Sequence, residues 1–254
     1  MIAVPYHLGR RAVEVGSGPL AILDSLRQRC VIIERTNGET HELAAVADVN
    51  SQLALAVAAQ NAPVIVLAGN CNTCLGTLRA LEQPGIVWFD AHGDFNTPET
   101  SISGALEGMS LAIATGHCHR DLMPHPVSEE NVVLAATRSL DVLEEVRLHA
   151  SKITLASLDA LPRAVDLLAA RVKTIYLHLD LDVLDPSISP GVNFSAPGGI
   201  SPDQLFDAVK YVIATGKLGA VAIANFNPGR DRDKRTLRIA ETLVAILSQA
   251  PRQE

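Results

Sequence analysis

Acidic and histidine side chains alternate directly after an apolar run near the middle of the sequence. The run from Ile86 to Phe89 predicts a buried strand. Asp90, His92 and Asp94 follow it at every second position, and on an extended backbone such residues face the same way. Carboxylates so close together repel each other unless a cation lies between them. The spacing therefore indicates a metal site at the end of this strand.

A second pair of acids follows another apolar strand. Asp180 and Asp182 occur in the segment LHLDLDVL, two positions apart, so they also share one face. Buried charges this dense are normally paired or bound to metal. The alternative is that these acids cap strand ends and bind water. The density of acids favours the metal interpretation.

The composition excludes several classes of protein. The chain has 254 residues, 48% of them hydrophobic, which suffices for a large core. A formal charge of -7 and a pI near 5.6 argue against a surface for nucleic acid or anionic membrane. No apolar run is long enough to span a bilayer, and the N-terminus lacks the order of a signal peptide. We expect a cytoplasmic protein whose four cysteines are free thiols.

Strands and helices alternate along the chain, with short polar connections between them. The strands are apolar on both faces, as a parallel sheet covered by helices requires. The predicted strands are Ile2 to Leu8, Cys30 to Glu34, Val64 to Ala68, Ile86 to Phe89, Asn131 to Ala136, Lys152 to Leu155, Thr174 to Leu179 and Val221 to Ala224. The predicted helices are Pro19 to Arg29, Leu43 to Gln60, Leu75 to Glu82, Gly108 to Thr115, Val142 to Ala150, Leu161 to Arg171, Ser201 to Ala214 and Asp233 to Ser248.

This order predicts an α/β fold: one three-layer αβα domain over residues 1–254 with an eight-stranded, mainly parallel sheet. No Pro/Gly/Ser-rich linker divides the chain. In such sheets, sites form beyond the carboxyl ends of the strands. Cys71, Asp90, Asp180 and Asn225 all lie where a predicted strand has just ended, so we expect them at one edge of the sheet.

Three motifs occur in the order found in the arginase/agmatinase (ureohydrolase) family, which the chain resembles over essentially its whole length. The segment DAHGD at 90–94 matches the family's DAHxD, and LDLDVLDP at 179–186 contains its DxDxxDP. The segment LAGNCN at 67–72 lies where the family has LGGDHS. The resemblance implies an arginase-like fold, a pair of divalent metal ions, Mn²⁺ in this family, and hydrolysis of guanidino groups.

The resemblance also assigns the metal ligands by position. One ion would be bound by Cys71, Asp90, Asp94 and Asp180, and the other by Asp90, His92, Asp180 and Asp182. Two divalent ions about 4 Å apart activate water at neutral pH. Asp94 would accept a proton from the attacking water, and Glu107 would relay one to the leaving amine.

A substrate clamp is implied in the same way. Asn96, Ser101 and Ser103 match positions that hold the α-carboxylate of arginine. Asp141 and Glu144 match positions that approach its α-amino group. Subunits of the family assemble as trimers or hexamers, so the resemblance implies a homo-oligomer.

Three residues depart from the family's pattern. Cys71 replaces a histidine ligand, Glu107 replaces a loop histidine, and Asn225 replaces the glutamate that pairs with the guanidinium. Cys71 and the run HGDFNTPET resemble the N-hydroxyarginine hydrolase branch. The expected function is hydrolysis of a C–N bond in a guanidino or amidino amino acid, such as N-hydroxyarginine or arginine. The alternative is a pseudoenzyme of the same fold that binds metal or ligand without turnover.

Other cysteines and histidines have simpler interpretations. Cys71 and Cys74 form a CxxC, but no second feature supports a redox site, and Cys74 is expected to pack as an apolar residue. The cluster from His117 to His119 is expected in a solvated turn. His7 and His178 lie in apolar runs and are expected to be core histidines with satisfied hydrogen bonds.

Overall fold

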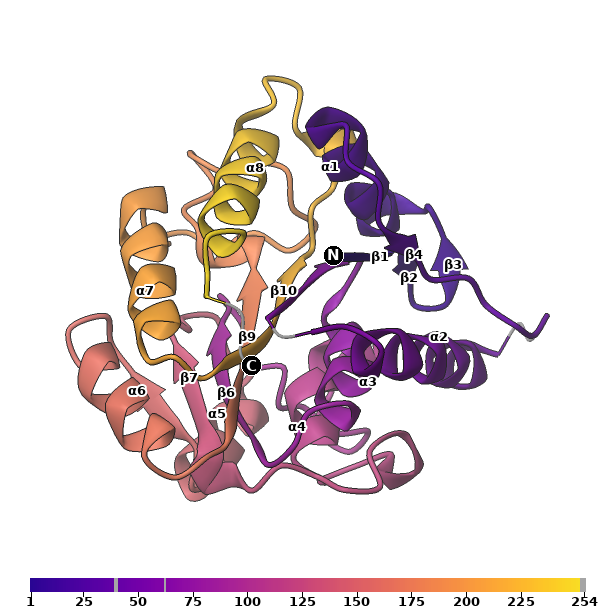
Figure 1. The fold of residues 1–254 in the computed structure, drawn as a ribbon. Coiled ribbons are helices and arrows are strands. Elements are labelled where there is room, and N and C mark those ends of the chain that lie inside the picture. Colours follow the sequence, from indigo (N-terminus) through magenta and orange to yellow (C-terminus); the bar gives the residue numbers. More distant parts are fainter. Residues whose placement is uncertain (39–40, 62, 252–254) are drawn as a thin grey trace.

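Eight parallel strands form the middle layer of the protein, in the order β4-β1-β5-β10-β9-β6-β7-β8 (Figure 1). The computed structural model describes residues 1–38, 41–61 and 63–251. The strands are β1 (Ile2–Val4), β4 (Val31–Ile32), β5 (Val64–Ala68), β6 (Pro84–Phe89), β7 (Val132–Ala135), β8 (Thr154–Ala156), β9 (Thr174–Asp180) and β10 (Leu218–Ala224). The predicted eight-stranded αβα fold is confirmed, and the sheet is parallel throughout the described residues.

Helices cover both faces of this sheet (Figure 1). One face, which we name the α1 face, packs against α1 (Gly18–Leu26), α6 (Leu161–Ala169), α7 (Pro202–Ala214) and α8 (Arg235–Leu247). The other, named the α2 face, packs against α2 (Glu42–Ala58), α3 (Cys74–Arg79), α4 (Ser110–Ala114) and α5 (Val142–Ala150). Each face buries its own apolar cluster, as strands with apolar side chains on both sides require.

Alternation along each strand decides which face a side chain meets. On β9, Ile175 and Leu177 belong to the cluster of the α1 face, whereas Tyr176 belongs to that of the α2 face. On β6, Phe89 packs on the α1 face and Trp88 on the α2 face. Because the period of an extended strand is two, the same alternation decides how polar residues at the strand ends are aimed.

The largest departure from the predicted elements lies near the N-terminus. The first strand was predicted from Ile2 to Leu8, but β1 ends at Val4. Pro5 has no amide hydrogen to donate, which favours a break. The chain then forms a small antiparallel sheet of β2 (Tyr6–His7) and β3 (Arg10–Arg11). This hairpin carries His7 out of the main sheet.

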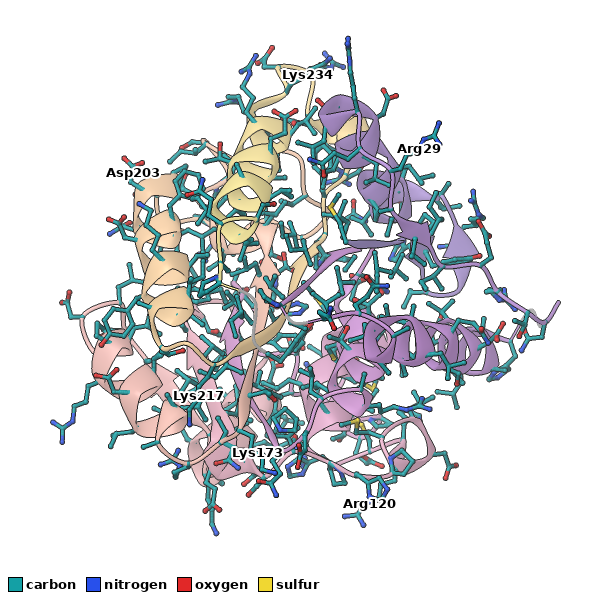
Figure 2. The ribbon with its side chains drawn as sticks, in the orientation of Figure 1. Arg29, Arg120, Lys173, Asp203, Lys217 and Lys234 are labelled. Atoms are coloured by element: carbon teal, nitrogen blue, oxygen red, sulfur yellow. The ribbon has the colours of Figure 1, made fainter. Side chains whose placement is uncertain are left out.

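Many charged side chains outside the candidate site lie at the periphery of the molecule. Arg29, Asp203 and Lys234 are exposed and extend outward from the ribbon (Figure 2). The described residues contain no helix that is both long enough and apolar enough to span a bilayer.

Candidate metal centre

A pocket of about 380 Å³ opens at the carboxyl ends of the central strands. All the site residues predicted from sequence line it, except Cys71 and Asp90, which are buried close by. The predicted residues in its lining are His92, Asp94, Asn96, Ser101, Ser103, Glu107, Asp141, Glu144, Asp180, Asp182 and Asn225. Ile102 and Phe194 add exposed apolar side chains to the same lining.

Four neighbouring strands bring the central residues together. β5, β10, β9 and β6 are adjacent in the sheet. Cys71 begins a short 3-10 turn after β5, and Asn225 directly follows β10. Asp180 is the last residue of β9, and Asp90 directly follows β6. The predicted convergence of these four residues is borne out, since parallel strands end at one edge.

Two groups of side chains among the described residues could each hold a metal ion. The first consists of Cys71, Asp90, His178 and Asp180, all buried, with one donor atom of each within 4.8 Å of the others. The second consists of Asp90, His92 and Asp182. Asp90 is common to both groups, as expected for a bridging ligand.

Asp94 belongs to neither group. It is buried, lines the pocket, and its Oδ2 has no hydrogen-bond partner. Its backbone is left-handed, with a φ of 48°, a conformation that Asp tolerates better than most residues. The sequence predicted a metal ligand here, and the structure shows an unpaired carboxylate oxygen at the same pocket.

The imidazole of His92 lies between two carboxylates. Its Nδ1 is 3.1 Å from Asp182 Oδ2 and 3.4 Å from Asp90 Oδ1. Burial opposes the charged form of the ring, but hydrogen bonds to Asp182 and Asp90 raise the pKa of His92 to about 12. Burial, followed by repulsion from Asp90, raises the pKa of Asp182 to about 6. The ring therefore lies where the surrounding carboxylates favour a positive charge.

Backbone amides hold the acids in place. The amide of Asp182 donates to Asp180 Oδ1 at 2.8 Å, and that of His92 donates to Asp90 Oδ1 at 2.7 Å. Burial and the charges of Asp182 and Asp90 raise the pKa of Asp180 well above its ordinary value. Burial and the charge of Asp90 do the same to the pKa of Asp94. A bound metal cation would relieve this repulsion.

Gly93 permits the close approach of α5 to this turn. A Cβ at position 93 would lie 2.7 Å from Glu144 Oε1 and 2.8 Å from Leu140 Cδ2. A side chain here would displace both groups. The glycine inside DAHGD thus has a packing reason.

Three of the predicted substrate-clamp residues, Asn96, Asp141 and Glu144, are linked by hydrogen bonds. Asn96 Nδ2 donates to Asp141 Oδ2 at 3.0 Å. Glu144 accepts from the amide of Phe95 at 2.8 Å and from that of Asp141 at 3.2 Å. Both carboxylate oxygens of Glu144 therefore serve the backbone and fix the pocket wall, whereas Ser101 lies toward its more exposed side.

Asn225 contacts the metal-ligand residues as well as the pocket. Its Nδ2 donates to Asp180 Oδ2, and it lies 3.4 Å from Cys71 Sγ. Its Oδ1 is buried without a hydrogen-bond partner. Asn225 has a φ of 64°, and asparagine adopts this left-handed conformation more readily than most residues. The amide thus offers an acceptor to a ligand in the pocket.

His7 contacts Glu107 across a separation of 100 residues, which the sequence prediction missed. His7 Nε2 lies 3.3 Å from Glu107 Oε2, and Nδ1 lies 3.1 Å from Glu14 Oε2. Burial opposes protonation, but the hydrogen bond to Glu107 raises the pKa of His7 overall. Glu107 Oε1 has no hydrogen-bond partner. The expectation of a core histidine missed this pairing with a pocket residue.

His178 also differs from its prediction. Its side chain is fully buried, and burial lowers its pKa to about 3, so the ring is neutral at pH 7. Nδ1 contacts the hydroxyl of Tyr176, but Nε2 has no hydrogen-bond partner. The prediction of a satisfied core histidine is therefore wrong. One signal was available, because His178 precedes Asp180 by two positions and so shares its face.

Arg138 is a second residue that the sequence did not reveal. Its guanidinium donates to the carbonyls of Asp182 at 2.9 Å, Val183 at 3.0 Å and Ala196 at 2.8 Å. Its backbone amide donates to Ala91 O at 2.9 Å. This half-buried side chain joins the loops that carry the two acidic motifs.

The remaining cysteine and histidine predictions agree with the structure. Cys71 and Cys74 are buried free thiols, and Cys74 packs in the cluster of the α2 face. Burial raises the pKa of both thiols well above the ordinary value. His117 pairs with Glu129 at 2.7 Å. Within residues 1–38, 41–61 and 63–251, the segment from His117 to His119 takes part in no potential metal-binding group.

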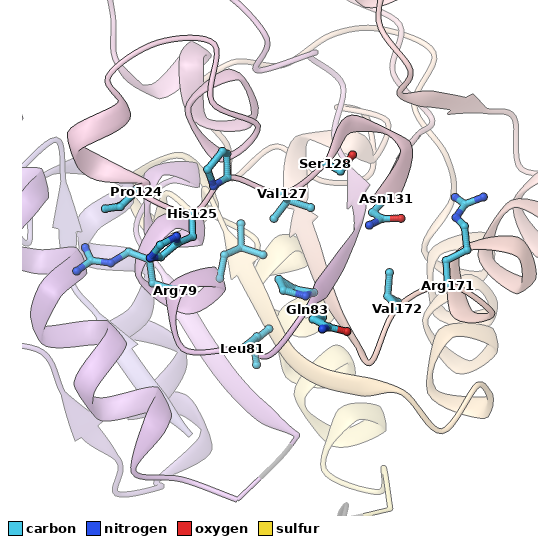
Figure 3. A pocket seen from close by; sticks show the side chains of 13 residues that line it. Arg79, Leu81, Gln83, Pro124, His125, Val127, Ser128, Asn131, Arg171 and Val172 are labelled. Atoms are coloured by element: carbon cyan, nitrogen blue, oxygen red, sulfur yellow. The ribbon is translucent and has the colours of Figure 1, made fainter.

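A larger cavity, of about 630 Å³, lies at the opposite end of the sheet (Figure 3). It lies near the starts of β6, β7 and β9, and its charged lining is basic, with Arg79, Arg171 and the nearby His125. Figure 3 shows Arg79 and His125 on one side of this cavity and Arg171 on the other. None of the predicted site residues belongs to it.

Comparison with known proteins gives consistent matches along the whole chain. A sequence model described as "Arginase family" matches residues 11–248. The arginase of Brevibacillus brevis is 32% identical, over 96% of this chain and 95% of the relative. Arginase from Bacillus subtilis has a TM-score of 0.85 at 29% identity, covering 99% of both chains. Entamoeba histolytica arginase, solved in complex with L-ornithine, has a TM-score of 0.86 at 26% identity, covering 98% of this chain and 97% of that one.

Proposed function

This chain belongs to the arginase family, and from that premise we propose that it is a metal-dependent hydrolase of a guanidino or amidino amino acid. The observation that carries the proposal is the single pocket in which the acids, imidazole and amides converge. Perturbed titratable groups gathered in one cleft are typical of catalytic sites.

The donor set fits a pair of divalent cations. Asp180 and Asp182 have raised pKa values because they are buried beside other acids. His92 Nδ1 lies between Asp90 and Asp182, so its ring could bind a cation together with these acids. Carboxylate and imidazole ligands suit divalent ions such as Mn²⁺. We assign the two ions to the ligand sets Cys71, Asp90, Asp94 and Asp180, and Asp90, His92, Asp180 and Asp182. When bound, such a pair activates water for attack at neutral pH.

Asp94 and Glu107 are proposed as the proton-transfer groups. Each is buried at the pocket and has one carboxylate oxygen without a hydrogen-bond partner. Asp94 would accept a proton from the attacking water through this unpaired oxygen. Glu107 would deliver a proton to the leaving amine, and His7 would orient its carboxylate from behind.

The rest of the pocket suits an amino-acid substrate. Ser101 and Ser103 would bind the α-carboxylate with Asn96, and Asp141 would meet the α-amino group, with Glu144 holding the wall. The L-ornithine complex of the Entamoeba histolytica relative makes an amino-acid ligand the natural choice. We also propose that the chain assembles as a trimer or hexamer in the cytoplasm.

The residue at position 225 favours a weakly basic substrate. An arginine guanidinium is always charged, and a carboxylate opposite it would stabilise it. Asn225 is neutral and offers an unpaired Oδ1 as acceptor. Losing one charge-assisted hydrogen bond costs roughly 1.5–3 kcal/mol. A hydroxylated guanidine is less basic and carries a hydroxyl that can donate to an amide oxygen, so we propose N-hydroxyarginine, or an amidine like it, over arginine.

The test compares turnover of arginine, agmatine and N-hydroxyarginine by manganese-loaded protein. The proposal expects the largest kcat/KM for N-hydroxyarginine. Preference for arginine would refute the charge argument but would leave the proposed hydrolase activity intact. The alternative, a pseudoenzyme that binds metal or ligand, is favoured by Cys71, Glu107 and Asn225, which all depart from the family's pattern. The pseudoenzyme alternative is supported if both ions bind and none of these substrates is cleaved.

A further inference from the structure

His178 faces the ligand residues of the metal centre from the middle of the sheet. On β9, Tyr176, His178 and Asp180 occupy alternate positions and therefore share the α2 face. The residue paired with His178 on β6 is Trp88, and the one on β10 is Ala222. Trp88 precedes Asp90 by two positions, as His178 precedes Asp180. The two neighbouring strands therefore place a ring and then an acid at matching positions.

The imidazole ring of His178 is held by its neighbours, but one of its nitrogens has no hydrogen-bond partner among the described residues. It stacks on Trp88 with centroids 3.6 Å apart and an interplanar angle of 14°. Nδ1 lies 2.8 Å from the hydroxyl of Tyr176, whereas Nε2 has no hydrogen-bond partner. The side chain is completely buried. A buried polar atom without a partner destabilises a fold, so its presence calls for a bound partner.

The neighbours of this nitrogen are potential metal ligands. Donor atoms of Cys71, Asp90, His178 and Asp180 all lie within 4.8 Å of one another. Cys71 Sγ is 3.1 Å from Asp180 Oδ2, and Trp88 Nε1 donates to Asp90 Oδ2 at 3.0 Å. One sulfur, one ring nitrogen of His178 and two carboxylate oxygens thus lie close enough together to bind the same ion.

We propose that His178 is a metal ligand, and that with Cys71, Asp90 and Asp180 it forms a deep site that selects Zn²⁺ over Mn²⁺. A thiolate, an imidazole and two carboxylates complete the four-coordinate set that zinc prefers. Thiolate is a poor match for manganese, and zinc exceeds manganese in general affinity for nitrogen and sulfur ligands. Tyr176 is a positioning residue, because a Nδ1–H that donates to its hydroxyl leaves the lone pair of Nε2 free.

The two metal sites of this protein are therefore unlike. The deep site contains sulfur, whereas the other group, Asp90, His92 and Asp182, offers only oxygen and nitrogen. That second site lies nearer the pocket, since His92 and Asp182 line it. It would keep the preference for Mn²⁺, giving a mixed zinc–manganese centre. The inference rests on the proposed two-metal centre, but it puts His178 in the place of Asp94 in the first ligand set and assigns zinc to that set.

The experiment measures metal binding rather than activity. Metal-free protein is dialysed against buffered Zn²⁺ and Mn²⁺ together, and each ion is quantified per chain by elemental analysis. The variants are His178→Phe, which keeps the stacking ring but removes both nitrogens, and Tyr176→Phe. His125→Phe, at an exposed histidine in the larger cavity, is the matched control. Binding of Co²⁺ reports the thiolate through its sulfur-to-metal absorption.

We expect wild type to hold zinc in the deep site and manganese in the other. Loss of residues that merely orient ligands weakens binding by roughly 10- to 100-fold. His178→Phe should therefore lower zinc affinity by about 100-fold or more and alter the cobalt spectrum, and Tyr176→Phe should lower it by about tenfold. His125→Phe should change nothing. Equal zinc affinity in wild type and His178→Phe would overturn the inference.

A crystal structure of the zinc-loaded wild type decides the matter even if the variants fail to fold. The inference requires the ion about 2.0–2.1 Å from His178 Nε2 and about 2.3 Å from Cys71 Sγ. An ion that ignores His178 overturns the inference and leaves the hydrolase proposal intact. If His178 binds zinc but the protein cleaves no guanidino or amidino compound, the hydrolase proposal is wrong and the inference about His178 stands.

Discussion

Two cavities lie at opposite ends of the same sheet and differ in volume, in the charge of their lining and in hydrogen bonding. The cavity at the amino ends is larger, about 630 Å³ against 380 Å³. Its charged lining is basic and spread out, with Arg79 and Arg171 on opposite sides (Figure 3). The pocket at the carboxyl ends gathers six acidic residues into the smaller volume.

Hydrogen bonding separates the two cavities further. Among the described residues, buried side-chain atoms without partners include Asp94 Oδ2, Glu107 Oε1 and Asn225 Oδ1, all in the acidic pocket. No such atom belongs to the lining of the larger cavity. A folded protein tolerates unsatisfied groups mainly where a ligand will satisfy them. Convergence of unpaired groups, rather than volume, therefore marks the functional end of this sheet.

Replacing a bridging ligand should have the largest effect. Asp180→Asn removes a charge from a group that contacts Cys71, Asn225 and the acids around it. We expect both ions to be lost, with a fall in kcat/KM of about a thousandfold or more, because metal activation supplies several kcal/mol. Elemental analysis and steady-state kinetics measure the two effects. Full metal occupancy in this variant would contradict the bridging role.

Adding a carboxylate to each cavity in turn should show that only the acidic pocket determines substrate specificity. Asn225→Glu places a charge opposite the substrate and should shift specificity toward arginine by about 10- to 100-fold. Asn131→Glu adds the same group to the larger cavity and should change kcat/KM less than about twofold. Competition between arginine and N-hydroxyarginine is the measurement. An unchanged preference between arginine and N-hydroxyarginine in Asn225→Glu would contradict the charge argument.

His7 should matter to catalysis although it lies behind the pocket lining. His7→Gln leaves Glu107 without its buried partner, and we expect kcat to fall about tenfold with little change in KM. The pKa of His7 is raised, so its imidazolium supports Glu107 at low pH and loses its proton as pH rises through that raised value. Wild type should thus show a decline on the alkaline side that the variant lacks.

A double variant distinguishes this role from simple destabilisation. If His7 acts through Glu107, His7→Gln combined with Glu107→Gln should be no slower than Glu107→Gln alone. Additive losses would show that His7 acts independently of this carboxylate.

The smallest effect is expected at the basic cavity. Arg79→Ala and Arg171→Ala remove exposed positive charges that face no acidic cluster in that cavity. Turnover and metal content should stay within about twofold of wild type. A larger loss of activity would show that the two ends of the sheet are coupled.

Much of the fold could be predicted because local patterns are strong. The helix Val142–Ala150 and the strand Val64–Ala68 were predicted to the residue. Asp141 caps the start of the helix, and Pro63 and Gly69 bound the apolar strand. The strand β10 was predicted too short, from Val221 instead of Leu218. Gly219 weakens the local strand signal, but pairing with β9 along this stretch restores it.

The metal centre could also be predicted in outline. Alternation along a strand is a local property, so Asp90 and His92, like Asp180 and Asp182, were expected to point together. The resemblance to the arginase family, now confirmed, supplied the relation between the two motifs. The edge of the sheet where these acids meet could thus be predicted from the chain alone.

Tertiary structure decided which polar atoms are satisfied. Glu144 looked like a substrate ligand but accepts backbone amides of Phe95 and Asp141. His178 looked like a satisfied core residue, yet among the described residues its Nε2 has no partner, and its ring lies beside a buried cluster of possible ligands. Local sequence sets the direction of a side chain, whereas its hydrogen-bond partners come from strands and loops as much as 100 residues away, as with His7 and Glu107. Only the folded chain brings those partners within reach.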